Sequence, residues 1–198
     1  MLILLPPSEG KTAPRSGAPL DPASLTLAGD DDVDAARAVG AVVCGDECYA
    51  ELGWDAWDGA VVPCILSDEV SGGDLTGLLS VYSLSKQSNL AGYRAAFAAG
   101  DPQLVATLVN TRKHAGMIVP APVQHAMVVA LGDDAHVEAQ KELYRTRRET
   151  LLPAVIEAGF RVDQSEAGLY LWATEGMDAW QSIARLADLG ILAGPGHF

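Results

Sequence analysis

The sequence has little positive charge and few aromatic residues. Its 198 residues include 13 lysines and arginines against 26 aspartates and glutamates, and 6% of the residues are aromatic. The formal net charge of -13 argues against a general binder of nucleic acids or anionic membranes, because both need a positive protein surface. We therefore expect neither nucleic acid nor membrane as a partner.

The hydrophobic pattern of the sequence also predicts neither a membrane-spanning segment nor a secretory leader. No apolar stretch reaches the roughly 20 residues that cross a bilayer. The apolar opening lacks preceding positive charge and is soon interrupted by proline, unlike a signal peptide. The three cysteines, Cys44, Cys48 and Cys64, have no zinc-like spacing with histidine. We expect reduced thiols in a cytoplasmic protein.

What the chain does contain is enough apolar sequence for a packed fold. Hydrophobic residues make up 49% and charged residues 20%, which is typical of globular proteins and too apolar for disorder. The charge is unevenly distributed, with 14 acidic and 3 basic residues in 1–80 against 12 and 10 in 81–198. An anionic ligand would therefore meet less repulsion in the second stretch.

The hydrophobic periodicity predicts alternating strands and helices after a proline-rich loop over residues 6–22. We expect a boundary near Asp30, where composition and periodicity both change. Asp101 and Pro102 are typical of the cap and first turn of a helix. Strands that are apolar throughout favour a parallel sheet with helices on both faces. The predicted strands are 2–5, 41–44, 77–82, 95–99 and a pair within 160–174, and the helices are 33–39, one from 102, 122–131, 134–158 and 177–189.

Polar side chains gather where the predicted strands end, which is the sheet edge that binds ligands in open α/β folds. A carboxylate there can pair with a protonated ring nitrogen, and a lysine can form a Schiff base once burial favours its neutral amine. Hydroxyls and an arginine bind phosphate. These are the groups that a protein supplies to pyridoxal phosphate. The residues concerned are Asp46, Tyr49, Ser83, Ser85, Lys86 and Arg94.

Two segments carry a resemblance to a known family. Asp46-Glu47-Cys48-Tyr49 and the stretch Ser83–Arg94, which reads SLSKQSNLAGYR, resemble the class I/II aminotransferases of pyridoxal-phosphate fold type I. The segments 46–54, 112–117 and 168–172 resemble the actinobacterial succinyldiaminopimelate aminotransferases of lysine biosynthesis. The resemblance covers residues 33–198, and the family commonly has glycine where Ala96 stands.

The resemblance assigns a role to each residue of the set. Lys86 would be the catalytic residue that binds the cofactor covalently and moves the proton at the substrate's α-carbon. Asp46 would pair with the pyridine nitrogen, and Tyr49 would hydrogen-bond the phenolic oxygen of the ring. The phosphate ligands would be Ser83, Ser85 and Arg94.

The resemblance also implies an architecture, partners and a reaction. The fold would be α/β, with the second half of the large-domain sheet and its covering helices in residues 31–120 and a truncated α+β part of the small domain in 121–198. Glutamate and succinyl-2-amino-6-oxopimelate would be the substrates, and the family's members are homodimers. The family's glycine-rich helix start, stacking aromatic and asparagine are not recognisable before residue 33, and its carboxylate-binding arginine lies past residue 198. We therefore expect the chain alone to be incomplete and inactive.

Residues 1–29 resemble a different family. The string Pro6-Pro7-Ser8-Glu9-Gly10-Lys11 is similar to the start of the YaaA family of peroxide-stress proteins, and we treat residues 1–30 as a separate N-terminal segment. Two alternatives to an aminotransferase follow, a peroxide-stress protein of the YaaA family and a non-catalytic fusion remnant. The length of sequence that matches argues against the YaaA alternative, because the rest of the YaaA sequence is not recognisable after residue 30.

Several other features have simpler interpretations. His114, His125 and His136 recur every eleven residues, but Pro120 and Pro122 interrupt any common helix, so we expect no metal site. We expect exposed salt bridges from the basic cluster 144–148 with its neighbouring glutamates. Four tryptophans are expected in a core or an interface: Trp54, Trp57, Trp172 and Trp180.

Overall fold

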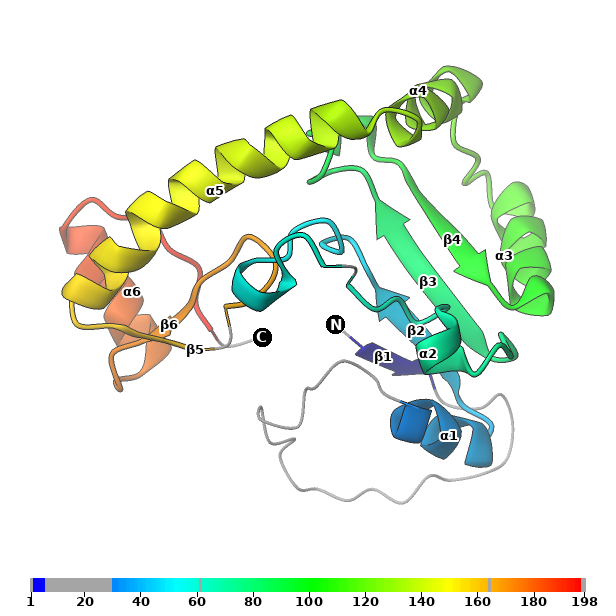
Figure 1. Ribbon diagram of the computed structural model, residues 1–198, viewed down its shortest axis with the longest axis horizontal. Helices are drawn as coiled ribbons and strands as arrows, with labels where there is room; N and C mark the ends of the chain where they lie inside the picture. Colours follow the sequence, from blue (N-terminus) through cyan, green and yellow to red (C-terminus); the bar gives the residue numbers. More distant parts are fainter. Residues whose placement is uncertain (1, 6–29, 61, 164, 197–198) are drawn as a thin grey trace.

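The computed structural model describes residues 2–5, 30–60, 62–163 and 165–196. At its centre lies a four-stranded sheet of β1 (Leu2–Leu5), β2 (Val42–Asp46), β3 (Leu78–Ser83) and β4 (Ala96–Gly100), in that order (Figure 1). A second sheet pairs β5 (Arg161–Asp163) with β6 (Trp172–Thr174). With its helices the chain is a mixed α/β fold, and the predicted strands are confirmed to within a few residues.

The central sheet is mixed, so the prediction of a parallel sheet is wrong. β2 and β3 are parallel, with Asp46 opposite Val81, whereas β1 and β4 run antiparallel to their neighbours. Residues 84–95 contain turns and a short 3-10 helix, Ala91–Tyr93, in place of a crossover helix, so the chain reverses direction between β3 and β4. At the end of β4, a side chain on Gly100 (φ +136°) would collide with the carbonyl of Leu78.

Helices form where the periodicity predicts them, with short additions. The short α2 (Asp68–Ser71), which follows a turn at Ser67, and a 3-10 helix, Asp55–Trp57, are not predicted from the sequence. The predicted helices are α1 (Asp30–Ala38), α3 (Pro102–His114), α4 (Ala121–Leu131), α5 (Asp134–Glu157) and α6 (Ala179–Asp188).

The buried core is small and lies under α1. Val33 and Ala36 of α1 pack on Val43 and Leu78 of the sheet, together with Ile65 and Val70. By contrast, none of the residues of α3, α4, α5 and α6 is buried. Large apolar side chains on these helices are exposed in the described part of the chain, among them Val109, Val128, Leu151 and Trp180.

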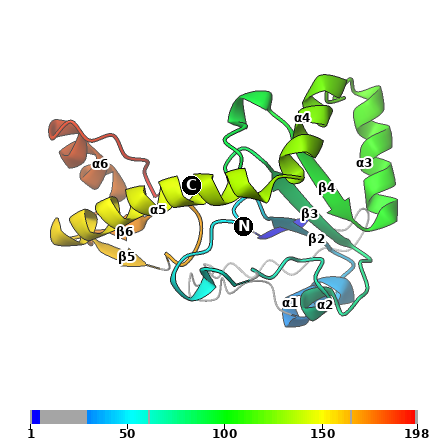
Figure 2. The same cartoon turned by 45° about the horizontal axis from the view of Figure 1, so that its top comes forward.

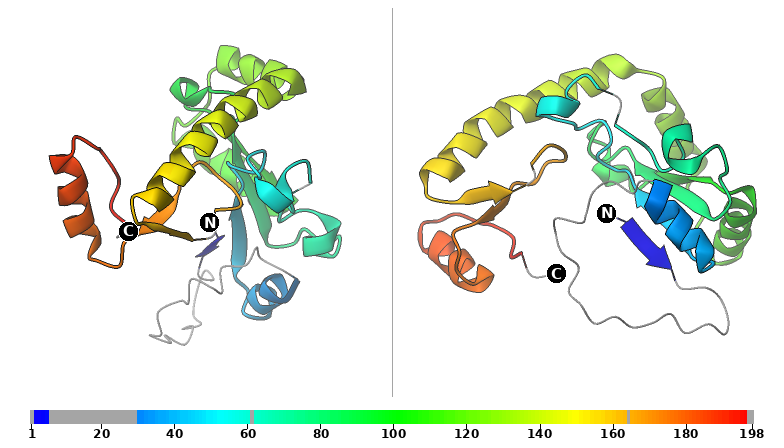
Figure 3. Two further views of the ribbon diagram at one scale, coloured as in Figure 1. Left: turned by 60° about the vertical axis from the view of Figure 1, so that its left-hand side comes forward. Right: turned by 60° about the horizontal axis from the view of Figure 1, so that its bottom comes forward.

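The long helix α5 connects the central sheet to the second one. It begins beside α4 and extends to β5, β6 and α6, as all the ribbon views show (Figures 1, 2 and 3). Within the described ranges, no helix is both long and apolar enough to cross a bilayer. The proline-rich stretch 6–22 and most of the YaaA-like segment lie outside the described residues. The division into 1–30, 31–120 and 121–198 stays a prediction.

Asp101 caps α3 as predicted and also joins two strands. Its Oδ1 accepts hydrogen bonds from the backbone N–H groups of Gln103 (2.7 Å) and Leu104 (3.4 Å), and its Oδ2 accepts one from Gly77 at 2.9 Å, just before β3. These backbone donors, Gly77 first, hold the pKa of Asp101 below its usual value. The carboxylate therefore links the start of β3 to the end of β4.

We expect Asp101→Ala to lower the free energy of unfolding, and Asp101→Asn to lower it less at neutral pH because the amide oxygen still accepts. Since the pKa is lower in the folded state, the contribution of the charge is complete above the ordinary carboxyl pKa of about 3.9. It is lost as the pH falls through the folded-state pKa. Urea unfolding at neutral and acidic pH measures both effects. Equal acid sensitivity of the wild type and Asp101→Asn would contradict this role.

Candidate functional site

Three strand ends meet at one edge of the central sheet. β2 ends at Asp46 and its parallel neighbour β3 ends at Ser83, while the antiparallel β4 begins at Ala96, directly opposite Ser83. The carboxyl ends of β2 and β3 and the start of β4 therefore share this edge, where ligands bind in α/β sheets. The backbone brings together the predicted residues that lie at or just beyond these ends.

Two hydroxyls converge at the end of β3. The Oγ atoms of Ser83 and Ser85 lie 2.8 Å apart, and the Ser83 hydroxyl also accepts a bond from the N–H of Ser85 at 3.2 Å. Ser83 donates a longer bond, 3.4 Å, to the carbonyl of Ala95. Both hydroxyls belong to the segment that leads into Lys86, so a ligand with several acceptor oxygens can bind there.

Lys86 and Arg94 lie on the connection between β3 and β4. Lys86 is half-buried in a turn whose flanking side chains, Leu84 and Gln87, are buried. Arg94 has a φ of +50°, a strained conformation for a residue with a side chain, and such strain is concentrated at functional sites. Its exposed guanidinium donates to the carbonyl of Ala91 at 3.4 Å. Among the described residues, no hydrogen bond joins Arg94 to the Ser83–Ser85 pair.

Asp46 and Tyr49 lie on the turn after β2. Asp46 accepts a 3.4 Å bond from the N–H of Cys48, and the Tyr49 ring meets Tyr170 edge to face, with 6.2 Å between centroids. Burial, followed by the hydroxyl of Tyr170, raises the pKa of Tyr49 to about 12. Burial and the neighbouring Asp46 raise the pKa of Cys48 to about 11. Both groups are therefore protonated donors at neutral pH.

Sequence reasoning missed Glu47, the half-buried anchor of this turn. Its carboxylate accepts hydrogen bonds from the Cys64 thiol (3.0 Å), the N–H of Ile65 (2.6 Å) and the Ser80 hydroxyl (2.5 Å). Burial and then the bond to Glu47 raise the pKa of Cys64, which keeps the thiol protonated as a donor. The three cysteines are unpaired, in line with the prediction of reduced thiols. Two polar residues in otherwise apolar segments, Cys64 and Ser80, were the signal available in the sequence.

A junction around Trp54 ties the turn after β2 to α5 and to the loop before β6. Trp54 is 2% exposed, and its Nε1 donates to the carbonyl of Gly168 at 2.7 Å. The backbone pairs here as well, because Trp54 N–H donates to Glu166 and Gly168 N–H to Leu52, at 2.8 and 2.9 Å. The same loop carries Tyr170, the neighbour of Tyr49.

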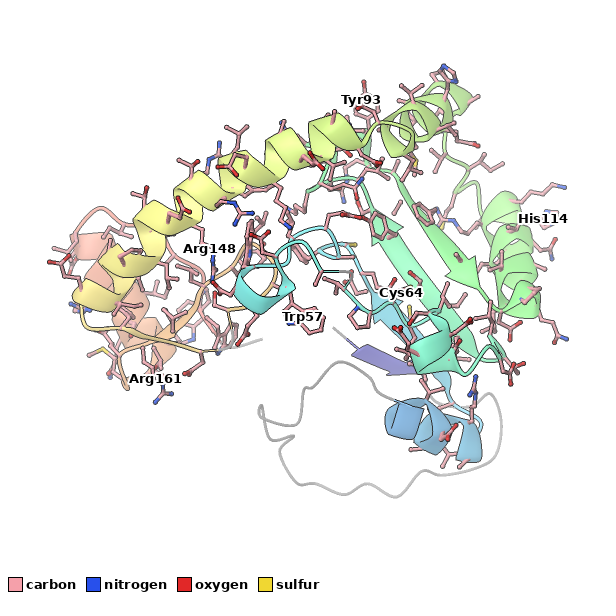
Figure 4. All side chains as sticks on the ribbon, viewed as in Figure 1. Trp57, Cys64, Tyr93, His114, Arg148 and Arg161 are labelled. Carbon is pink, nitrogen blue, oxygen red and sulfur yellow. The ribbon has the colours of Figure 1, made fainter. Side chains whose placement is uncertain are left out.

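The basic side chains of α5 close this junction, so the prediction of exposed salt bridges with neighbouring glutamates is confirmed for Arg145 but incomplete. Arg145 does pair with Glu142 as expected, but it also binds Asp58 at 2.9 Å, and Lys141 lies 3.4 Å from the same carboxylate. Arg148, labelled in Figure 4, donates to the Ser165 hydroxyl at 2.7 Å. The cations of Lys141, Arg145 and Arg148 lie 5.6–5.7 Å from the Trp54 ring, a cation–π arrangement. Of the four tryptophans, Trp54 is buried, whereas Trp172 and Trp180 are exposed.

Charge distinguishes the Ser83–Ser85 pair, the predicted phosphate site, from a neighbouring cavity. That cavity, about 490 Å³, is lined by Tyr82 and Gln87 and by the carboxylates of Glu51, Asp134 and Glu138. An anion is repelled by such a lining, so the Ser83–Ser85 pair is the better place for a phosphate. The donors at this edge, together with an amine and a carboxylate on neighbouring strand ends, fit the phosphate, aldehyde and ring nitrogen of pyridoxal phosphate.

Comparison with known proteins gives one family. The model of aminotransferase class I and II matches residues 29–197. The chain is 56% identical over 163 residues to 4-dedimethylamino-4-oxo-anhydrotetracycline transaminase OxyQ of Streptomyces rimosus, covering 82% of this chain and 44% of that protein. It is 58% identical over 166 residues to a probable aminotransferase of Mycobacterium tuberculosis, covering 84% and 39%.

Solved structures agree with this match. The N-succinyldiaminopimelate aminotransferase of Mycobacterium tuberculosis superposes with a TM-score of 0.68 at 28% identity, covering 81% of this chain and 42% of that one. The chain thus spans about two-fifths of the length of these relatives. Residues 1–28, which carry most of the YaaA-like segment, lie outside the family match.

Proposed function

The chain belongs to the class I and II aminotransferases, and on that premise we propose that its sheet edge binds pyridoxal phosphate for amino transfer between an amino acid and a keto acid. The family is pyridoxal-phosphate dependent. The observation that carries the proposal is the placement of Asp46 and the Ser83–Ser85 pair on adjacent strand ends, with Lys86 directly after them. When bound, the cofactor supplies an electron sink for the substrate's α-carbon.

Each residue of the site then has one task. The Lys86 amine holds the aldehyde end of the cofactor, and its Nζ is the atom that carries the transferred proton. The Asp46 carboxylate accepts a hydrogen bond from the protonated ring nitrogen, which keeps that nitrogen charged. The Tyr49 phenol, protonated because its pKa is raised to about 12, donates to the ring oxygen. The phosphate is held by Ser83, Ser85 and Arg94.

The substrates are proposed from the relatives. The resemblance to succinyldiaminopimelate aminotransferases and the superposition on such an enzyme support glutamate as the amino donor and succinyl-2-amino-6-oxopimelate as the acceptor, in lysine biosynthesis. The higher identity to a transaminase named for an anhydrotetracycline supports a second candidate, a polycyclic keto compound. Single-turnover assays that offer each acceptor to the glutamate-treated complete catalytic unit, and not to the 198 residues alone, distinguish the two.

We further propose that the described residues form part of a larger cytoplasmic catalytic unit, a homodimer when complete. The exposed apolar faces of α3 to α6 and the two-fifths coverage of the relatives support this, and both support inactivity of the 198 residues alone. Size-exclusion chromatography tests the oligomeric state, and a glutamate-dependent transfer assay tests the inactivity of the 198 residues alone. The YaaA resemblance of residues 1–29, with a peroxide-stress role or a fusion origin, stays a prediction.

The phosphate ligands give a direct test of the proposed site. We expect Ser83→Ala with Ser85→Ala, or Arg94→Gln alone, to weaken binding of pyridoxal phosphate by roughly 10- to 100-fold, because hydrogen bonds to a charged group contribute about 1.5–3 kcal/mol. Binding of pyridoxal, which lacks the phosphate, should change little. Fluorescence titration with both ligands measures the difference.

Arg161→Gln is the matched control, because Arg161 lies on the second sheet and pairs with Asp163. It should bind both ligands like the wild type. Equal losses for pyridoxal and pyridoxal phosphate in the site variants would contradict the phosphate assignment. A wild-type chain that binds neither ligand would contradict the proposed function of these 198 residues.

A further inference from the structure

The turn that carries Lys86 is fixed at its ends by burial. Leu84 is 1% exposed and Gln87 is 6% exposed, and the Tyr82 hydroxyl donates to the Gln87 side chain. The N–H of Ser88 donates to the Leu84 carbonyl at 3.1 Å, which closes the turn. Lys86 lies between these anchors, so contacts with the turn hold the backbone from which its amine extends.

Helix α5 contacts this turn at two points. The Nε2 of His136 lies 2.8 Å from the Ser88 hydroxyl, and the Tyr144 hydroxyl donates to the backbone carbonyl of Lys86 at 3.0 Å. His136 and Tyr144 are eight residues apart, which places them on one face of a helix. That face is the less exposed side of α5 and continues to Lys141, Arg145 and Arg148.

Asp133 orients His136 for this contact. One carboxylate oxygen of Asp133 accepts from the N–H of Ala135 at 3.1 Å and so caps α5. The other lies 3.3 Å from the Nδ1 of His136. A carboxylate at Nδ1 favours the proton on that nitrogen, and in this tautomer of the neutral ring the Nε2 accepts from the Ser88 hydroxyl. The cap of the helix and the turn that holds Lys86 are therefore joined through one imidazole ring.

We propose that His136 and Tyr144 are positioning residues that hold the Lys86 turn against α5, with Asp133 fixing the imidazole. The proposal rests on the proposed function in one respect, the identification of Lys86 as the cofactor-binding lysine. The same helix contacts Trp54 and the second sheet, so α5 connects these elements to the Lys86 turn through two side chains.

The order Asp133–His136–Ser88 is also the order of orienting acid, base and nucleophile in hydrolytic triads. Here the Asp133 carboxylate caps α5, and the backbone N–H of Ser88 closes the turn at Leu84, so both residues have structural roles. The side-chain amide of Gln87 also donates a hydrogen bond to the Ser88 hydroxyl, with 3.3 Å between Nε2 and Oγ. We therefore assign the three groups to holding the turn, and labelling of Ser88 by a fluorophosphonate would overturn that assignment.

The first test needs no cofactor. Hydrogen–deuterium exchange of the peptide covering residues 84–90 is compared between the full-length wild type and three variants, His136→Ala, His136→Gln and Tyr144→Phe. The loss of one hydrogen bond, about 1 kcal/mol, predicts roughly fivefold faster exchange for His136→Ala and for Tyr144→Phe. His136→Gln, whose amide can still reach Ser88, should restore the slow exchange. His125→Ala, on the exposed surface of α4, is the matched control and should leave it unchanged.

The second test measures the consequence for Lys86. The wild type and variants are incubated with pyridoxal phosphate, reduced with borohydride, and the initial rate of labelling at Lys86 is read by peptide mass spectrometry. We expect a rate several-fold lower for His136→Ala and near-wild-type for His136→Gln. Tyr144→Phe, which removes a single oxygen, serves where His136→Ala lowers the folded fraction seen by circular dichroism.

The outcomes separate this inference from the proposed function. Unchanged exchange at 84–90 in both His136→Ala and Tyr144→Phe overturns the contact, and faster exchange with unchanged labelling overturns the positioning role. If the wild type takes no label while exchange still responds to the variants, the proposed function fails and the holding of the turn by α5 stands.

Discussion

Replacing Trp54 with alanine is expected to lower the free energy of unfolding by about 3–5 kcal/mol, the usual cost of removing a large buried aromatic side chain. The side chain is 2% exposed and donates to the Gly168 carbonyl at 2.7 Å. Its removal leaves that carbonyl without its donor and the cations of Arg145 and Arg148 without the ring they contact. The junction between the turn after β2, α5 and the loop before β6 should therefore loosen as a unit.

Denaturant unfolding monitored by circular dichroism measures this change. Trp180→Ala is the matched control, because Trp180 is 60% exposed on α6, and we expect it to cost far less. Trp54→Phe keeps a ring in place but removes the donor, so it should lie between the wild type and Trp54→Ala. A cost for Trp54→Ala no larger than that of Trp180→Ala would show that the junction does not support the fold.

The second large effect concerns Lys86. Lys86→Ala is expected to remove covalent attachment of pyridoxal phosphate completely, because no other amine follows the Ser83–Ser85 pair on the sheet edge in the described part of the chain. Arginine at the same position keeps a positive charge but cannot form the link, so Lys86→Arg should fail as well. Absorbance difference spectra on adding the cofactor report the attachment.

Lys113→Ala is the control for this experiment, since Lys113 is an exposed residue on α3. It should retain the cofactor band of the wild type. A band that survives in Lys86→Ala would mean that attachment is adventitious, at surface lysines. A band lost equally in Lys113→Ala would mean that the loss reflects the overall stability of the chain.

Local sequence was enough to predict most of the elements. Apolar runs bounded by glycine and aspartate place β2 and β3, and Asp101 followed by Pro102 marks the start of α3, where the structure has the cap. Strand direction was not predictable in this way. Burial pattern alone does not distinguish parallel from antiparallel strands, and the reversal into β4 depends on the turns of residues 84–95.

The residues of the candidate site also fall into two groups, those that local sequence predicts and those whose contacts depend on the tertiary arrangement. Asp46, Ser83 and Lys86 lie at strand ends or just after them, so the rule that ligands bind at such an edge was sufficient to group them. The contacts of His136 and Tyr144 with the Lys86 turn, and those of α5 with Trp54, depend on how α5 crosses the molecule. No spacing in the sequence encodes a pairing such as Tyr144 with Lys86. Glu47 was missed because its donors lie in two segments that are distant in the sequence, Cys64 with Ile65 in one and Ser80 in the other.

The central claim is that the carboxyl edge of the sheet holds pyridoxal phosphate through Lys86. Incubating the wild-type chain with the cofactor, reducing it with borohydride and mapping the modified peptide tests this claim most directly. We predict one label per chain, on the peptide that contains Lys86, lost when Asp46→Ala removes the partner of the ring nitrogen or when free phosphate competes for Ser83, Ser85 and Arg94. A label distributed over Lys113 and Lys141, or none at all, would contradict the claim.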